Sequence, residues 1–386
     1  MAFDVSIVPC GSYEIAECRR ALEAVLAPIG GLDWVRCGMR VAVKTNLVTF
    51  LRPEAAATTH PALLCALTDL LVERGAEVVL GDSPGGLYSA AFVDRVYAAS
   101  GVRAVEAHGA RLNHDFTQKE VDYPSGQVCR RFPYTAWLEQ ADAVINFCKL
   151  KTHGMMALSC AAKNLFGVIP GIQKPEFHFQ FSNPVDFARM IVDLDTYVAP
   201  VLSICDAVVG MEGNGPTAGS PRPIGCLAAS RSPHQLDLLC AALIGLRREE
   251  VPTLEAAFER GLLPETADEL AVCGDWRAMV VPDFQRIEGQ SGLLFQGKGG
   301  TWGQLRGAVI RKAICPRPAV QKTACIGCGK CREICPARAI SLRRGLPVIR
   351  RIACIRCFCC QEFCPKGAMQ VARPLIARLL SRSHSA

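Results

Sequence analysis

The sequence predicts an α/β fold, in which helices flank a mostly parallel sheet, followed by a small α+β domain. The first observation is that strand-like and helix-like segments alternate over roughly the first 240 residues, as is typical of parallel sheets. The second is that eight cysteines near the C-terminus form two copies of one pattern. With 386 residues, 50% of them hydrophobic, the chain has the length for two or three domains and a large core.

The elements of the larger domain follow from local patterns. Apolar residues recur at helical spacing from Ile15 to Leu26, and Pro61 opens a helical segment that ends before Gly75. Short apolar runs between such segments predict buried strands. The predicted strands are 5–9, 40–45, 77–80 and 143–147, and the predicted helices are 14–26, 61–74, 233–246 and 247–262.

Polar residues follow three of these predicted strands at the point where each one ends. Ligands of open α/β sheets gather at the carboxyl ends of the strands, so we expect these residues to form a site. The candidate catalytic residues are Lys149, Lys151, His153 and Asp82. The candidate substrate-binding residues are Lys44, Asn46, Ser83, Lys163 and Asn164.

The richest of these segments carries Lys149, Lys151 and His153 at alternating positions. On an extended chain, alternating residues project from one face, and Lys174 and His178 follow downstream. Several cations and imidazoles together suit an anionic ligand such as a carboxylate or a phosphate. The alternative is that the lysines form an ordinary solvated face.

Other polar positions leave more than one role open. Asp82 with Ser83 could orient a hydroxyl, bind a metal or cap the following helix. The loop 81–86 has neither the Gly-Lys-Ser/Thr ending of a Walker A sequence nor a G-x-G-x-x-G pattern, so we expect no dinucleotide site of the classical type. Three further acids could supply oxygen ligands or a general base, or could make local loop hydrogen bonds: Asp193, Asp206 and Glu212.

The two cysteine runs each have the form C-x2-C-x2-C-x3-C-P. They comprise Cys325, Cys328, Cys331 and Cys335 before Pro336, and Cys354, Cys357, Cys360 and Cys364 before Pro365. This is the ligand pattern of bacterial two-cluster ferredoxins, so we expect two [4Fe–4S] clusters and single-electron chemistry. Zinc sites also use paired C-x2-C, but two interlocked sets with this repeat favour clusters.

The fourth cysteine of each run is too far along the chain to close its own cube, so it reaches across to the other cluster. The first cluster is therefore assigned to Cys325, Cys328, Cys331 and Cys364, and the second to Cys354, Cys357, Cys360 and Cys335. Cys359 lies between ligands and is interpreted as a spare buried thiol.

The chain has 21 cysteines, and most of those outside the two runs stand singly in apolar stretches. Free thiols and oxygen-sensitive clusters are typical of a reducing compartment, so we expect a cytoplasmic protein. The N-terminal residues have no basic and apolar regions of a signal peptide, and the apolar runs are too short for a transmembrane segment.

The charge is unevenly distributed along the chain. Residues 311–386 contain 16 Lys and Arg against two acids, whereas the remainder carries 27 basic and 34 acidic residues. A strongly basic electron-transfer domain attracts an acidic redox partner protein or the acidic body of its own chain. The basic region lacks the aromatic pattern of strand-binding proteins, which argues against nucleic acid.

These observations predict four parts. Residues 1–284 form the α/β domain, 285–317 a linker rich in Gly and Gln, and 318–371 the ferredoxin-like domain, whose halves repeat at an offset of 29 residues, from Cys325 to Cys354. Residues 372–386 form a basic tail with a small apolar stripe, for which a docking helix is favoured over a membrane anchor.

Several segments together resemble the family called domain of unknown function 362. They are Val43–Leu47, Gly81–Gly85, Lys149–His153, Lys163–Gly167 and Gly210–Pro216. The resemblance covers roughly residues 5–250, and Thr45 and Cys148 stand where the family pattern leads us to expect proline. Many members of that family carry a C-terminal two-cluster ferredoxin domain, so the resemblance implies the same architecture here.

Three functions are compatible with the sequence. The first is an iron–sulfur oxidoreductase that passes electrons to a reductive reaction on a small anion at Lys149, Lys151 and His153. The second is a non-catalytic electron carrier or adaptor whose α/β domain docks a redox partner. The third is a non-redox enzyme in which the clusters are structural. A deep pocket joining the polar strand ends near Cys325 or Cys354 favours the first.

Overall fold

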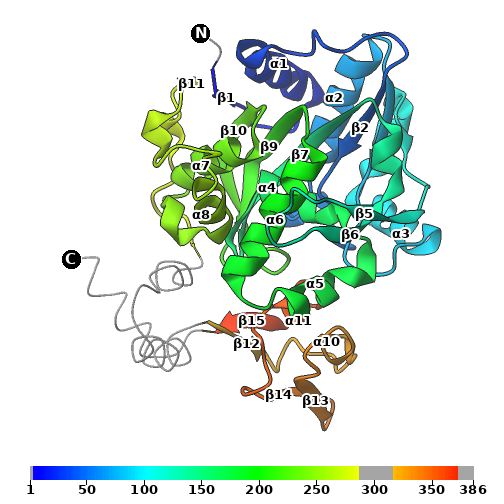
Figure 1. Cartoon of the computed structure of the whole chain (residues 1–386), viewed down its shortest axis with the longest axis vertical. Helices are drawn as coiled ribbons and strands as arrows, with labels where there is room; N and C mark the ends of the chain where they lie inside the picture. Colours follow the sequence, from blue (N-terminus) through cyan, green and yellow to red (C-terminus); the bar gives the residue numbers. More distant parts are fainter. Residues whose placement is uncertain (1–2, 287–315, 373–386) are drawn as a thin grey trace.

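The computed structural model describes residues 3–286 and 316–372 (Figure 1). The larger domain occupies residues 3–286, and the small domain, coloured orange to red, lies below it in this view. The predicted linker 285–317 and the predicted tail 372–386 lie outside the described residues except at their edges.

The larger domain is built on a nine-stranded sheet with the order β11-β1-β10-β9-β7-β2-β3-β4, and β8 pairs with β7 beside this path. The strands β2, β3, β4, β7 and β9 are parallel to their neighbours within that group, whereas β10 runs antiparallel to both β1 and β9. The predicted α/β class with a mostly parallel sheet is therefore confirmed. The strands are β1 Val5–Pro9, β2 Arg40–Lys44, β3 Glu77–Gly81, β4 Arg111–Leu112, β7 Ala143–His153, β8 Ala157–Ser159, β9 Leu202–Glu212, β10 Ser220–Ser230 and β11 Val272–Cys273, with a separate hairpin of β5 Gln118–Asp122 and β6 Arg131–Thr135.

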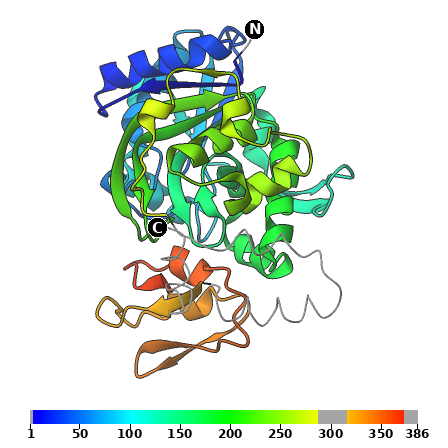
Figure 2. The same cartoon turned by 90° about the vertical axis from the view of Figure 1, so that its left-hand side faces the viewer.

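Helices cover both faces of the sheet (Figures 1 and 2). On β7, Ile145 and Phe147 pack into the core beneath α1 and α2, whereas Cys148 and Leu150 pack into the core beneath α6 and α7. This alternation follows from the two-residue period of a strand that is buried on both faces. The helices are α1 Ile15–Leu26, α2 Pro61–Val72, α3 Ala90–Ser100, α4 Ala161–Leu165, α5 Lys174–Gln180, α6 Pro184–Val198, α7 Pro233–Leu243 and α8 Pro252–Phe258.

Strand β7 is longer than its apolar run predicts. The sequence places its end at residue 147, but the strand continues to His153 because it keeps pairing with β9 and β8. Its neighbour β2 ends at Lys44, opposite Asn146. The second half of β7 therefore extends past the carboxyl end of β2, into the region where a site is expected.

The small domain consists of two antiparallel strand pairs and two short helices. The pairs are β12 Arg317–Val320 with β15 Met369–Ala372, and β13 Ile340–Arg343 with β14 Leu346–Ile349; the helices are α10 Lys330–Glu333 and α11 Cys359–Glu362. The repeat is visible in the backbone, since Gly327 and Gly329 have φ of 68° and 79° and their equivalents Arg356 and Phe358 have 60° and 62°.

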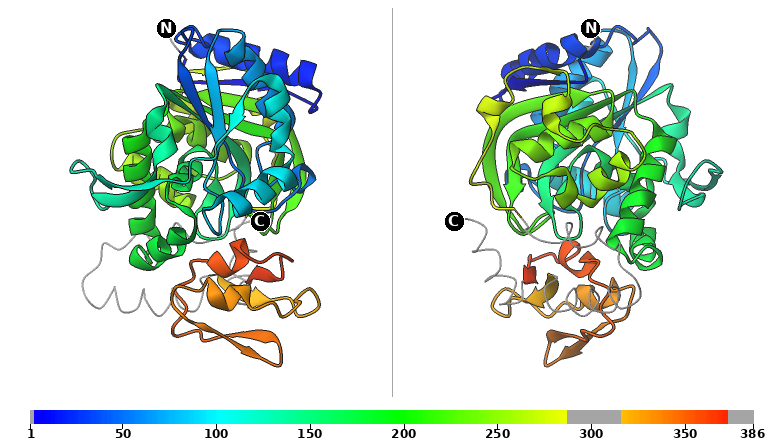
Figure 3. Two further views of the ribbon diagram at one scale, coloured as in Figure 1. Left: turned by 90° about the vertical axis from the view of Figure 1, so that its right-hand side faces the viewer. Right: turned by 60° about the vertical axis from the view of Figure 1, so that its left-hand side comes forward.

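Helix α11 faces the larger domain, and the hairpin of β13 and β14 points away from it (Figures 1 and 3). Gln361 donates hydrogen bonds from Nε2 to the carbonyls of Asn214 (2.8 Å) and Gly215 (3.1 Å), in the loop between β9 and β10. A Cβ at Gly154 would lie 3.2 Å from the Phe358 ring, so glycine permits the end of β7 to pack against α11. The docking thus brings the second cysteine run next to β7.

Candidate active site

The structure brings the eight cysteines of the two runs together in two groups of four. One cavity is lined by Cys325, Cys328, Cys331 and Cys364, and another by Cys335, Cys354, Cys357 and Cys360. Each group takes three cysteines from one run and the fourth from the other, in the combination that the spacing predicts. Four thiolates suit one [4Fe–4S] cluster, so both donor sets fit the predicted groups.

The crossing cysteines have equivalent surroundings in the two halves. The backbone N–H of Ala339 donates to Sγ of Cys335 at 3.2 Å, and that of Ala368 donates to Sγ of Cys364 at 3.2 Å. Hydrogen bonds to a thiolate stabilise its charge and tune the potential of a cluster that it binds. In both halves of the repeat, the fourth cysteine therefore accepts a hydrogen bond from the backbone N–H four residues downstream.

A cavity of about 80 Å³ lies where the end of β7 meets α11. The α/β domain contributes residues from β7, from the loops after β2 and β3, and from α4 and α5, and the small domain closes the cavity with Glu362 and Phe363. Its polar lining consists of Asn46, Asp82, Ser83, Lys151, His153, Ser159, Lys163, Asn164, Lys174, His178 and Glu362. Seven of the nine predicted α/β site residues are in this set, and Lys44 and Lys149 are not.

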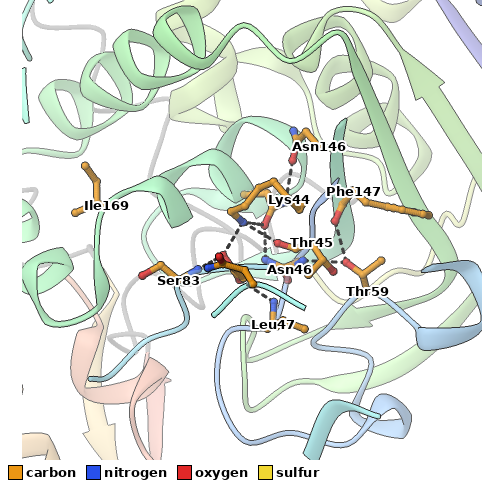
Figure 4. A network of polar contacts seen from close by, with 12 residues as sticks. Lys44, Thr45, Asn46, Leu47, Thr59, Ser83, Asn146, Phe147 and Ile169 are labelled. Atoms are coloured by element: carbon orange, nitrogen blue, oxygen red, sulfur yellow. Dashed lines mark hydrogen bonds and ion pairs between the residues drawn. The ribbon is translucent and has the colours of Figure 1, made fainter. Parts of the chain in front are cut away.

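Lys44 and Asp82 form the buried base of the site. Figure 4 shows Lys44 within the network of polar contacts that also includes Asn46 and Ser83. Nζ of Lys44 lies 2.7 Å from Oδ1 of Asp82 and donates to Oδ1 of Asn164 at 3.1 Å. Burial lowers the pKa of Lys44, and the Asp82 carboxylate opposes that effect. A Cβ at Gly167 would lie 2.5 Å from Oδ1 of Asp82, so only glycine lets the turn after α4 approach this ion pair. The two charges of this ion pair compensate each other, and the Lys44 ammonium also holds the Asn164 side chain of the cavity lining.

Two lysines of the cavity have proton affinities suited to neutral pH. Lys151 donates from Nζ to Oδ1 of Asn46 and to the carbonyl of Ala57, both at 2.6 Å, and burial together with the charge of Lys163 lowers its pKa to about 7. Lys174 donates to the carbonyl of Ser83 at 2.7 Å, and burial lowers its pKa to about 7 as well. Neither lysine has a carboxylate within ion-pair distance among the described residues.

Lys163 directs a positive charge at the cavity. Its Nζ lies 4.6 Å from the centre of the Phe166 ring, and within residues 3–286 and 316–372 no carboxylate comes within 4.0 Å of it. Burial lowers its pKa, and the more distant charge of Glu362 raises it. A lysine that lines a cavity without an acidic partner is suited to bind an anion there.

His153 and Glu362 connect the two domains. Nδ1 of His153 accepts hydrogen bonds from the N–H groups of Met155 (3.1 Å) and Met156 (3.2 Å), so the ring proton belongs on Nε2. Nε2 lies 3.1 Å from Oε1 of Glu362. Burial lowers the pKa of His153, which keeps the ring neutral. Burial alone would raise the pKa of Glu362, but His153 and Lys163 outweigh it and lower that pKa, so the carboxylate stays charged.

His178 adds a second imidazole to the cavity wall. Its ring stacks on Phe187 with the ring centres 4.3 Å apart, and burial lowers its pKa to about 3. Among the described residues its Nδ1 has no hydrogen-bond partner. A buried nitrogen without a partner is costly unless water or a ligand satisfies it.

Lys149 points to a different partner from Lys151 and His153. Its Nζ lies 2.8 Å from Oδ2 of Asp206 and 2.8 Å from the hydroxyl of Tyr13, and the ion pair is almost completely buried. The Asp206 carboxylate also accepts from the N–H of His60 at 3.0 Å. The structure therefore places Lys149 in an ion pair that ties β7 to β9 rather than in the cavity.

The other two acids with open roles also have local partners. Asp193 accepts from the N–H groups of Val128 (2.9 Å) and Cys129 (2.8 Å) and pairs with Arg260 at 2.8 Å. Glu212 accepts from the N–H of Gln285 at 2.9 Å. These contacts agree with the alternative of local hydrogen bonding rather than a shared metal ion.

Sequence reasoning missed Glu362 as a site residue. It stands between two predicted cluster ligands, and its equivalent in the first repeat, Glu333, is exposed on α10. No local signal separates the two glutamates, because only the docking of α11 against β7 brings Glu362 to His153. Lys174 and His178, which the sequence groups with the cations and imidazoles suited to an anion, both line the cavity from α5.

Two sequence families match the chain. Residues 41–242 match the family described as a domain of unknown function, DUF362, and residues 317–365 match a 4Fe-4S dicluster domain. The chain belongs to the DUF362 family. The second match shows that this DUF362 protein also carries an iron–sulfur domain of the kind that transfers electrons. Both matches agree with the family resemblance and the cysteine pattern of the sequence.

A curated relative is the thylakoid-associated protein sll1697 of Synechocystis, which is 31% identical over 75% of this chain and 89% of its own length. Among solved structures, the lactate racemase apoprotein of Thermoanaerobacterium thermosaccharolyticum matches with a TM-score of 0.41 and 14% identity. That match covers 64% of this chain, and this DUF362 protein spans 58% of the racemase. Within residues 3–286 and 316–372, no helix has both the length and the apolar character needed to cross a membrane.

Proposed function

We propose that this protein is an iron–sulfur oxidoreductase that passes single electrons through two [4Fe–4S] clusters to a small anionic substrate in the cavity. The observation that carries the proposal is the position of Glu362. It lines the cavity beside His153 and precedes the cluster ligand Cys364 by two residues. A cluster held by Cys364 would therefore lie next to a cavity that is rich in lysines.

The charges of the cavity support an anionic substrate. Three lysines line it: Lys151, Lys163 and Lys174. The lining also holds two carboxylates, of which Asp82 is paired with Lys44 and Glu362 lies beside His153. Two opposite charges about 4 Å apart attract by about 4 kcal/mol at an effective dielectric constant of ~20. A carboxylate or another small oxyanion in the cavity would be attracted by several lysines. Its oxygens would also accept hydrogen bonds from the lysines and imidazoles that line the cavity.

Different residues around the cavity can donate a proton, bind the anion and support the cavity wall during a reduction. When bound, each cluster supplies one electron at a time, so two clusters match a substrate that takes up two electrons and two protons. Lys151 is our candidate general acid, because its pKa of about 7 lets it donate a proton at neutral pH and regain one afterwards. Lys163 binds and orients the anion, while Asn46, Asn164 and the Lys44–Asp82 pair hold the wall in place.

A non-catalytic electron carrier is the second candidate. The cavity holds only about 80 Å³ and α11 closes it, so any substrate larger than a small anion requires α11 to move. If the protein is an electron carrier, an anion bound in the cavity would hold the two domains together without reacting. The clusters would then pass electrons from one partner protein to another. The experiment that separates the two candidates is the response of reduced clusters to added anions.

An acidic redox protein is our candidate electron donor. A groove between the domains is lined by the proposed cluster ligands Cys335 and Cys364 and by five basic residues against two acids. The basic residues are Arg95, Lys330, Arg332, Arg338 and Lys366, and the acids are Glu176 and Glu333. The chain's own segments 287–315 and 373–386 contain four basic residues against one acid and three against none, so neither complements a basic groove. Electrostatic attraction of this kind raises association rates and weakens with salt.

The expected cytoplasmic location remains a prediction. The relative named as thylakoid-associated raises a second location for this chain, at a membrane surface. Fractionation of cells that express the full chain decides between them, since a surface-bound protein sediments with membranes and is released by salt.

The test begins with anaerobic iron and acid-labile sulfide analysis, which should give about eight of each per chain. EPR spectra of the reduced protein are then recorded during titration with small carboxylates and oxyanions. An anion that reoxidises the clusters with stoichiometric product formation supports the oxidoreductase. Clusters that are present but respond to no anion favour the electron carrier, and iron well below eight contradicts both.

A further inference from the structure

Three buried cysteines of the α/β domain bring their sulfur atoms together, outside the two cysteine runs of the small domain. They come from different segments: Cys148 from β7, Cys160 from the residue before α4, and Cys205 from β9. Sγ of Cys160 lies 3.5 Å from that of Cys148 and 3.4 Å from that of Cys205, and all three sulfurs lie within 4.8 Å of one another. Each residue is at most 1% exposed.

The spacing of these sulfurs is close to that around a single metal ion. Sulfurs bound to one ion at about 2.3 Å lie about 3.8 Å apart in a tetrahedral site and about 4 Å apart in a trigonal one. The observed separations require outward shifts of only a few tenths of an ångström. Ordinary packing of cysteine as a small hydrophobe explains each residue singly, but it gives no reason for three to converge.

The three sulfurs lie in the buried core, where water does not reach them. Metal ions bind the thiolate form of cysteine, so a soft cation bound here would replace the thiol protons and supply the positive charge beside the sulfurs.

We propose that Cys148, Cys160 and Cys205 bind one soft metal ion, Cu(I) or Zn(II), at a structural site whose metal binding does not depend on the proposed reaction. Three thiolates satisfy trigonal Cu(I), which soft sulfur ligands select. Zn(II) prefers four ligands, and Cys240 on α7 offers a further buried sulfur, in hydrogen-bond contact with Cys160 and Cys205.

The ion would fix the walls of the cavity. Cys148 stands three residues before Lys151 on β7, and Cys160 stands three residues before Lys163 on α4. A shared ion would tie these two elements to β9 through short, stiff bonds. It would thereby set the distance between the two lysines without touching a substrate.

The test uses the full chain with its iron complement filled, so that empty cluster sites cannot capture the added metal. Anaerobic protein is incubated with one equivalent of Zn(II) or Cu(I) and desalted, and its metals are measured by mass spectrometry. About one non-iron metal ion per chain should remain in the wild type and in Cys65→Ser, which removes a buried thiol of the opposite core. Cys160→Ser should retain at least tenfold less at unchanged iron content.

Cys240→Ser separates the two metals, because it should weaken retention of Zn(II) and leave that of Cu(I) unchanged. If Cys160→Ser does not fold, X-ray absorption of the loaded wild type replaces it and should show only sulfur at about 2.2–2.3 Å from the metal. Equal retention by the wild type and Cys160→Ser, or a first shell that contains nitrogen or oxygen, overturns the proposal.

Discussion

The carboxylate of Glu362 lies 3.1 Å from Nε2 of His153, although the two residues belong to different domains. The α/β domain supplies the lysines and imidazoles of the cavity, and the ferredoxin-like domain supplies the acid that closes it. Glu362 immediately follows Gln361, which anchors α11 to the α/β domain, and it precedes Phe363 and the proposed cluster ligand Cys364. One short segment therefore contains a docking contact, two residues of the cavity lining and a proposed cluster ligand.

Replacing Glu362 by Gln should strengthen anion binding. The Glu362 carboxylate competes with an anion for the field of Lys163, so its removal should raise the affinity for sulfate about tenfold. Glu333→Gln is the matched control, because Glu333 holds the equivalent position in the first repeat and is exposed. Isothermal titration of both variants gives the comparison, and weaker binding by Glu362→Gln would mean that this carboxylate organises the site instead.

Replacing Lys163 by Met should weaken anion binding about 10- to 100-fold, because a hydrogen bond to a charged group contributes about 1.5–3 kcal/mol. The fold should keep its stability, since Lys163 makes no ion pair among the described residues and contacts the Phe166 ring. Lys119→Met serves as a surface control, because Lys119 pairs with Glu139 on the hairpin side of the molecule. Equal affinity in the two variants would remove Lys163 from the site.

Anion affinity should fall as the pH rises through 7. Lys151 and Lys174 each have a pKa lowered to about 7, whereas a bound anion favours the charged ammonium forms. Below pH 7 both lysines are already charged, and above it binding must take up protons, so the association constant should drop by up to about tenfold per pH unit per lysine. Sulfate keeps its charge over this range and is the suitable probe. A flat profile from pH 6 to 9 would contradict the assignment.

Replacing Lys149 by Met should destabilise the fold instead of the binding site. The change leaves Asp206 buried without its partner, which costs about 3–5 kcal/mol. Chemical denaturation should show a large loss for Lys149→Met and a small one for Lys163→Met. Adding Asp206→Leu should restore part of the lost stability, because it removes the uncompensated charge. A double variant less stable than Lys149→Met alone would show that Asp206 has another essential contact.

The crossed cysteine arrangement predicts which variants share a phenotype. Cys328→Ser and Cys364→Ser should lose the same cluster signal, although they lie in different runs, and Cys335→Ser should lose the other. EPR of each reduced variant, with iron analysis, gives the assignment. A Cys364→Ser protein that instead matches Cys360→Ser would mean that each run closes its own cluster.

The regular elements could be predicted from sequence because their causes are local. The strand Val5–Pro9 and the start of α2 at Pro61 follow from an apolar run and from the fixed φ of proline. The end of β7 could not be predicted in this way, because pairing with β8 and β9 continues through a polar segment. Local propensity does not encode such long-range pairing.

The sequence predicts those site residues that lie at or just after the end of an apolar segment. Asn46, Ser83, Lys151 and Lys163 each follow or end an apolar run, and the sheet order brings them together. The role of Lys149 depends on Asp206, 57 residues away, and that of Glu362 depends on the docking of a second domain. Neither relationship leaves a pattern in the surrounding sequence.

The most direct measurement of the central claim is 31P pulsed ENDOR on the reduced protein with phosphate bound. Photochemical reduction with a deazaflavin avoids the sulfite that dithionite would add as a competing anion. If a cluster lies beside the anion cavity, the phosphorus nucleus should show a resolved dipolar coupling to a reduced cluster, and Lys163→Met should abolish it at the same phosphate concentration. Phosphate that binds in the wild type without any such coupling would contradict an electron path from the clusters to the cavity.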